Sequence, residues 1–126
     1  MSKSIFVSHV FEDFEYIKNL KKWESKSYLP GYTFTFDVAD IRGRGEEAIK
    51  RHLDTKLRGI YALLVFVGQD THSHEWIRFE VKKARKYNKK ICCLRIPNST
   101  GGIPSYLQGE KILPFDPKAL LSNLRS

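Results

Sequence analysis

The segment Ile60-Tyr-Ala-Leu-Leu-Val-Phe-Val67 is apolar along almost its whole length. Strands with one solvent-facing side alternate apolar and polar residues, whereas strands covered on both faces do not. An unbroken apolar run of this length is typical of a central parallel strand with helices on each side. This segment therefore predicts an α/β fold.

Strand and helix patterns alternate on both sides of this run. Further strands are predicted from short apolar or alternating segments at Ile5–Ser8, Tyr32–Val38, Lys90–Ile96 and Lys111–Phe115. Helices are predicted from apolar residues at helical spacing and from capping residues, at Glu12–Ser25, Glu46–Arg58, Trp76–Lys90 and Asp116–Leu124. This order predicts one doubly wound, mainly parallel five-stranded sheet of the flavodoxin-like type, with strand order 2-1-3-4-5. We expect residues 1–126 to form a single domain.

That strand order opens a crevice between the carboxyl ends of the first and third strands. Ser8 and His9 would lie on one lip of the crevice, and Gly68 and Thr71 on the other. The helix predicted from Trp76 starts at the second lip.

Glu80 is an anomaly on this helix. At 100° per residue it falls on the apolar arc, one turn after Trp76. The basic residues of 78–90 fall on the far side with Phe79, except Lys83, which lies at the edge of the arc. A carboxylate on a buried face costs several kcal/mol unless it is paired, protonated or open to a cleft. Two interpretations stay open: a rim carboxylate held by a backbone amide or lysine, or a functional carboxylate at the floor of a pocket.

The composition narrows the class of protein. The net charge is +8, which favours contact with an anionic ligand or partner. Zinc-finger, RNP-like and helix-turn-helix patterns are missing, so we do not expect nucleic acid as a partner. No apolar run reaches the roughly 20 residues of a membrane span, and the expected location is cytoplasmic.

Cys92 and Cys93 are adjacent in a predicted strand and should point to opposite faces as free thiols.

Two further segments carry weak signals. His72, His74 and Glu75 are clustered, but a further ligand at metal-binding spacing is missing, so we expect no metal. Arg42-Gly43-Arg44-Gly45 precedes a predicted helix, where amides and cations can hold phosphate, but it matches neither a Walker A loop nor a Gly-x-Gly-x-x-Gly fingerprint.

Four pieces of the chain together resemble a TIR domain, and more closely the bacterial TIR-like group of the Thoeris anti-phage system. They are Ile5-Phe6-Val7-Ser8-His9, Phe36-Asp37, Leu64-Val65-Phe66-Val67-Gly68 and Glu75-Trp76-Ile77-Arg78-Phe79-Glu80. The most specific piece is the Trp76-x-x-x-Glu80 spacing. The resemblance covers roughly residues 4–96.

The resemblance implies an enzyme that cleaves the nicotinamide–ribose bond of NAD+ and makes a cyclic ADP-ribose-type signal in anti-phage defence. It makes Glu80 the catalytic residue. It places Trp76 in the pocket of Glu80, Ser8 and His9 at the first-strand loop that lines the site, and residues 40–45 in a loop that covers the substrate. From their charge, Arg42 and Arg44 are expected to pair with the pyrophosphate. The full set of expected substrate-binding residues is Ser8, His9, Asp37, Arg42, Arg44, Gly68, Thr71 and Trp76. NAD+ is then the substrate, and no cofactor is expected.

The same resemblance implies two kinds of partner, a separate effector protein that senses the nucleotide product and further copies of the chain through TIR–TIR contacts. The chain lacks the arginines that some TIR enzymes carry after the first strand. The alternative is a non-enzymatic TIR-like interaction module.

Overall fold

The computed structural model of the protein describes residues 3–9, 15–36, 45–69 and 75–126. Its strands form one all-parallel, five-stranded sheet in the order β2-β1-β3-β4-β5. They are β1 (Lys3–Ser8), β2 (Tyr32–Thr35), β3 (Ala62–Val67), β4 (Lys90–Arg95) and β5 (Ile112–Leu113). The predicted α/β class and strand order are confirmed.

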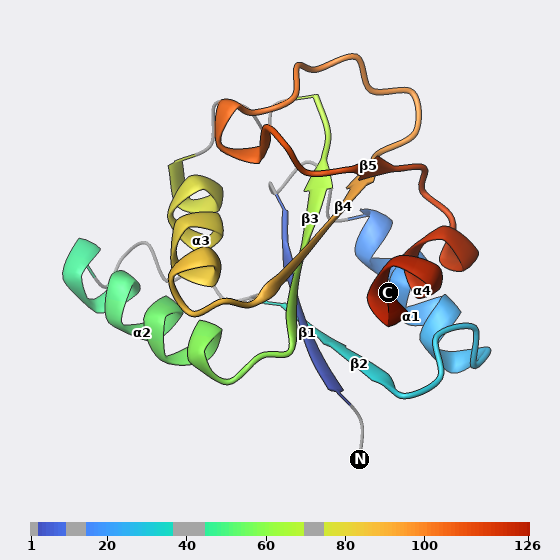
Figure 1. Ribbon diagram of the computed structural model, residues 1–126, viewed down its shortest axis with the longest axis horizontal. Helices are drawn as coiled ribbons and strands as arrows, with labels where there is room; N and C mark the ends of the chain where they lie inside the picture. Colours follow the sequence, from blue (N-terminus) through green and yellow to red (C-terminus); the bar gives the residue numbers. More distant parts are fainter. Residues whose placement is uncertain (1–2, 10–14, 37–44, 70–74) are drawn as a thin grey trace.

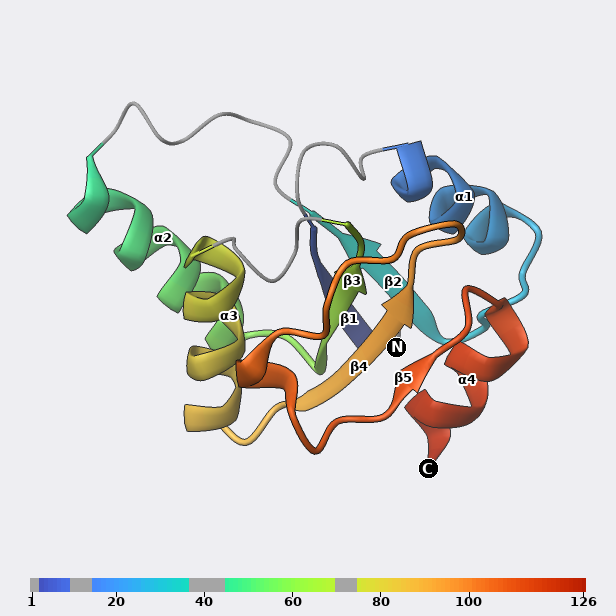
Figure 2. The same cartoon turned by 90° about the horizontal axis from the view of Figure 1, so that it is seen from above.

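Helices cover both faces of the sheet (Figures 1 and 2). On one face lie α1 (Glu15–Ser25) and α4 (Pro117–Arg125); on the other lie α2 (Glu46–Arg58), α3 (Glu75–Lys86) and a short 3-10 helix, η4 (Ser105–Leu107). Parallel crossovers are right-handed, so the helices change face where the chain reverses its direction across the sheet, between β1 and β3. None of the helices in the described part is long and apolar enough to cross a membrane.

The central strand β3 divides the core into two halves. All six of its residues are buried, with no measurable exposure. Ala62, Leu64 and Phe66 belong to the half under α1 and α4, and the residues between them belong to the half under α2 and α3, namely Leu63, Val65 and Val67. This two-sided burial is what the apolar run predicted.

The helix predicted to reach Lys90 ends at Lys86 instead, and that boundary was wrong. Asn88 adopts a left-handed conformation with φ of 57°. The N–H of Asn88 then donates to the Arg85 carbonyl at 3.1 Å and that of Lys89 to the Ala84 carbonyl at 2.8 Å. This closure caps the last carbonyls of α3, and asparagine tolerates the left-handed position that ends it.

Other boundaries shift by a few residues. β2 ends at Thr35, and β5 is only two residues long. α4 begins as predicted, with the Asp116 side chain accepting a bond from the Ala119 N–H at 3.0 Å and Pro117 following as its first residue.

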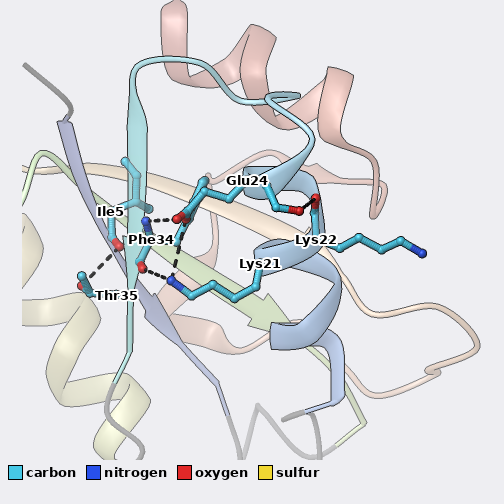
Figure 3. Close-up of polar contacts among 7 residues, drawn as sticks. Ile5, Lys21, Lys22, Glu24, Phe34 and Thr35 are labelled. Carbon is cyan, nitrogen blue, oxygen red and sulfur yellow. Dashed lines mark hydrogen bonds and ion pairs between the residues drawn. The ribbon is translucent and has the colours of Figure 1, made fainter.

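Side chains of α1 complete the outer edge of the sheet at β2 (Figure 3). The Phe34 N–H donates to the Glu24 carboxylate at 3.1 Å, and Lys21 Nζ donates to the Phe34 carbonyl at 2.8 Å. Both backbone groups of Phe34 are therefore satisfied by a helix, which protects an edge strand from pairing with another chain.

Cys92 and Cys93 lie on opposite faces of β4, as predicted, and both are free and buried. Burial raises the pKa of Cys92 to about 11 and that of Cys93 to about 12. Both thiols are therefore protonated at neutral pH and shielded from reagents.

We expect the free energy of unfolding to fall as the pH rises above 9, the ordinary thiol pKa. The folded state binds both thiol protons more tightly than the unfolded state does. The two protonated thiols therefore contribute fully to stability below pH 9, and this contribution is lost as the pH rises from 9 through the raised pKa values of about 11 and 12. Urea denaturation from pH 7 upward measures the effect. The control is the double variant Cys92→Ala/Cys93→Ala, whose free energy of unfolding should fall less at alkaline pH than that of the wild type. An equal fall would contradict the assignment of this effect to the two thiols.

Candidate active site at the carboxyl edge of the sheet

Ser8 and Glu80 meet at the carboxyl edge of the sheet. Ser8 is the last residue of β1, and its Oγ donates a hydrogen bond to Glu80 Oε1 of α3 at 2.6 Å. The two residues are 1% and 8% exposed, and within the described ranges they are the two buried polar side chains. Residues far apart in the sequence thus form one buried polar pair.

The strand alternation explains why these two side chains meet. Phe6 of β1 points into the half of the core under α2 and α3, so Ser8, two residues later, points the same way. Ile77, Val81 and Ala84 of α3 pack into that same half, which carries Glu80 to the sheet edge. The O–H···O length of 2.6 Å is typical of a hydroxyl that donates to a carboxylate.

Tyr106 of η4 lies within electrostatic range of Glu80. Its pKa is raised to about 12, first by burial and then by the negative charge of Glu80, while Arg78 acts in the opposite direction. The sequence reasoning missed Tyr106, because it lies in a segment that we interpreted only as a turn-rich connection.

The segment after β4 folds back over the end of β3. The Thr100 N–H donates to Gln69 Oε1 at 2.8 Å, and Arg95 Nη2 donates to the Gly101 carbonyl at 2.7 Å. A Cβ on Gly101 would lie only 2.2 Å from the Gln69 carbonyl oxygen and 2.6 Å from that of Gly68. Only glycine allows this close approach of two backbones. Arg95 Nη1 is buried here without a hydrogen-bond partner among the described residues.

His9 and Gly68 lie at the same carboxyl edge of the sheet. Gly68 follows β3 and is buried. The His9 ring lies 6.5 Å from the rings of both Phe36 and Phe66. Phe66 belongs to the half of the core under α1, so His9 lies on the opposite side of the edge from the Ser8–Glu80 pair.

Trp76 lies one turn before Glu80 on α3 but packs toward α2. Its ring makes an edge contact with the Phe79 ring, with a centroid distance of 5.8 Å. Both rings line a hollow that also includes Lys50 of α2. The expectation that Phe79 faces solvent was wrong, because it is partly buried against the core under α2 and α3. The role of Trp76 at the catalytic site stays a prediction.

Four predicted site residues, Asp37, Arg42, Arg44 and Thr71, lie outside the described residues. His72 and His74 lie outside them as well. Within the described part, no three histidine, cysteine or acidic side chains are grouped as metal ligands would be.

The structure has the features expected of a TIR-like domain: a parallel sheet in the order 2-1-3-4-5, a first strand that ends in serine, and a buried glutamate on the helix after the third strand. The chain belongs to the family described as "Thoeris protein ThsB, TIR-like domain", whose family model matches residues 6–101. The resemblance inferred from the sequence is confirmed.

The fold is similar to that in the "Crystal Structure of a prokaryotic SEFIR domain", with a TM-score of 0.59 and 13% sequence identity. The similarity covers 98% of this chain and 88% of that chain. At this identity the likeness concerns the fold alone. The comparison with curated proteins gave no match.

We expect Ser8→Ala to lower the free energy of unfolding by about 1.5–3 kcal/mol, because it removes a buried donor from a carboxylate. Urea denaturation measures the loss. Ser122→Ala, at an exposed position on α4, is the control and should change stability by no more than about 0.5 kcal/mol. Equal effects of the two substitutions would contradict a stabilising Ser8–Glu80 bond.

We expect Gly101→Ala to lower the free energy of unfolding by about 1–3 kcal/mol, because the new methyl group would collide with backbone oxygens that cannot rotate away. The control is Gly102→Ala, where a Cβ meets no atom within 4 Å. Thermal unfolding of both variants compares them. A Gly101→Ala variant as stable as Gly102→Ala would show that the loop shifts freely.

Proposed function

We propose that this chain cleaves the bond between nicotinamide and ribose in NAD+, with Glu80 as the catalytic carboxylate. The observation that carries the proposal is the burial of Glu80 at the carboxyl edge of the sheet, bonded to Ser8 at 2.6 Å. Ligands of open α/β sheets bind at this edge, near the point where the strand order reverses. A buried carboxylate is costly, and such groups cluster at functional sites.

The reaction suits a site with one carboxylate. The bond between the ribose C1′ and the nicotinamide nitrogen breaks, and its electron pair stays on nicotinamide, which leaves as a neutral molecule. The leaving group therefore needs no proton from a general acid. Positive charge develops on the ribose, and a carboxylate held close to it lowers the barrier electrostatically.

The second half of the reaction decides the product. Attack of water on C1′ gives ADP-ribose and a proton, whereas attack by a nucleophilic atom of the same molecule gives a cyclic ADP-ribose-type product and a proton. The proposal assigns the cyclic product to this chain, as a signal for a separate effector protein. Membership of the Thoeris family supports that assignment.

Within this proposal Ser8 is a positioning residue. Its hydroxyl holds one oxygen of Glu80, which fixes the carboxylate plane in a buried place. His9, Gly68 and Trp76 are retained as candidate substrate contacts, together with Asp37, Arg42, Arg44 and Thr71. Self-association through TIR–TIR contacts is part of the proposal as well.

The test is Glu80→Gln, which keeps an oxygen to accept the Ser8 bond and removes the negative charge. We expect the variant to fold and to lose NAD+ consumption by about 100-fold or more. The assay follows NAD+ loss, nicotinamide release and product mass in concentrated protein. The matched control is Glu110→Gln, whose carboxylate pairs with Arg85 at 3.4 Å on the surface and should have no effect.

Two outcomes would overturn the proposal. In the first, wild type and Glu80→Gln consume NAD+ equally. In the second, wild type releases no nicotinamide in any assembly state yet still pairs with other TIR-like domains, which would identify an interaction module.

A further inference from the structure

A basic groove lies between α2 and α3, on the outer surface of the molecule. Two hollows of about 330 and 260 Å³ share Lys50 and Phe79 in their linings and together make this α2–α3 groove. The two helices lie side by side in both views of the molecule (Figures 1 and 2).

Positive charge is concentrated in the α2–α3 groove. α2 contributes Lys50, Arg51 and Arg58, and α3 contributes four more cations, Arg78, Lys82, Lys83 and Lys86. Three acidic residues also line the groove, Glu47, Asp54 and Glu75, which leaves a net charge of +4, half of the chain's +8. The sequence placed most cations of α3 on the far side of a sheet-packing helix, where lysine and arginine are common, and it did not show that cations of α2 lie beside them.

Aromatic rings and Asp54 hold several of these cations in place. The Arg58 guanidinium lies 5.2 Å from the Tyr87 ring centroid, and Lys83 Nζ lies 5.7 Å from that of Phe79. Asp54 pairs with Arg58 at 3.2 Å and with Lys83 at 3.3 Å, and it accepts a hydrogen bond from the Tyr87 hydroxyl. Cations fixed in this way lose less conformational entropy when they bind an anion.

The groove suits a chain of phosphates better than a protein or a stacked base. Protein interfaces depend on exposed apolar anchors. The aromatic residues of the groove, Trp76, Phe79 and Tyr87, are only partly exposed. The large exposed hydrophobic residues of the described part, Tyr28 and Ile103, lie outside the groove. Base stacking needs open aromatic faces, but cations already lie over the rings of Phe79 and Tyr87, and the Trp76 ring is in edge contact with the Phe79 ring. Phosphate binding needs only correctly placed charge, and guanidinium groups match phosphate geometry.

We propose that the α2–α3 groove binds a nucleic-acid strand through its phosphates, without reading the bases. This proposal does not rest on the chemistry proposed at Glu80. It reverses the expectation from the sequence that nucleic acid is not a partner.

The test compares two triple variants with the same loss of charge. Arg51→Gln/Lys82→Gln/Lys86→Gln removes exposed cations from the groove, and Lys18→Gln/Lys22→Gln/Lys118→Gln removes exposed cations from α1 and α4. The probe is a fluorescent 16-nucleotide single strand of mixed sequence, titrated at several salt concentrations. We expect wild type to bind with salt-dependent affinity and the groove variant to lower the salt slope by about 2, that is about 0.7 for each lost contact. The control variant should keep the wild-type slope.

The outcomes that overturn the proposal are distinct. If both variants lose the same amount of binding, the strand is attracted to net charge alone. If folded wild type does not bind the strand at low salt, the groove is not a nucleic-acid site. Displacement of the strand by a glutamate-rich peptide of equal charge, at equal concentration, would show an acidic protein surface as the better ligand. Circular dichroism establishes that each variant is folded.

Discussion

The burial of β3 on both faces is the constraint on which the rest of the structure depends. A strand with no measurable exposure needs a helical layer on each side. Because crossovers are right-handed, a chain that reverses its direction across the sheet supplies both layers. This chain runs from β1 toward one edge through α1 and returns across β1 through α2 to the other side. The reversal places the carboxyl ends of β1 and β3 beside each other, and α3 follows β3 in the chain. The candidate site is thus a geometric result of covering one apolar strand.

The Ser8–Glu80 pair shows how this geometry sets the chemistry. The alternation of β1 turns Ser8 toward α3, and the apolar residues of α3 hold the helix so that Glu80 reaches the sheet edge. The carboxylate is therefore kept in a place where water solvates it poorly, which strengthens its effect on nearby charge. The same negative charge acts on the phenol of Tyr106. The pKa of Tyr106 is raised to about 12 by burial and by the charge of Glu80.

Sequence patterns predicted the features that repeat along the chain. The apolar run of β3, the alternation of β2 and the cap at Asp116 each have a local cause, and so they could be placed without a structure. The end of α3 could not, because lysine and arginine continue through the Asn88 turn and favour a longer helix. Glu80 was found because it interrupts an apolar arc, but its partner Ser8 could be assigned only once the strand order was known. Tyr106, the close approach at Gly101 and the charge facing α3 depend on contacts between distant segments, which no local pattern records.

The packing of α3 has a mechanical consequence. One side of this helix holds Glu80 against β1, and another side meets α2 through Phe79 and Lys83. A helix moves as a stiff rod, while a hydrogen bond of 2.6 Å weakens when its atoms separate by less than an ångström. Any force that tilts or slides α3 relative to α2 is therefore transmitted directly to the orientation of the Glu80 carboxylate. The surface of α3 that carries Glu80 and the surface that contacts α2 belong to one rigid helix, so a displacement of one also displaces the other.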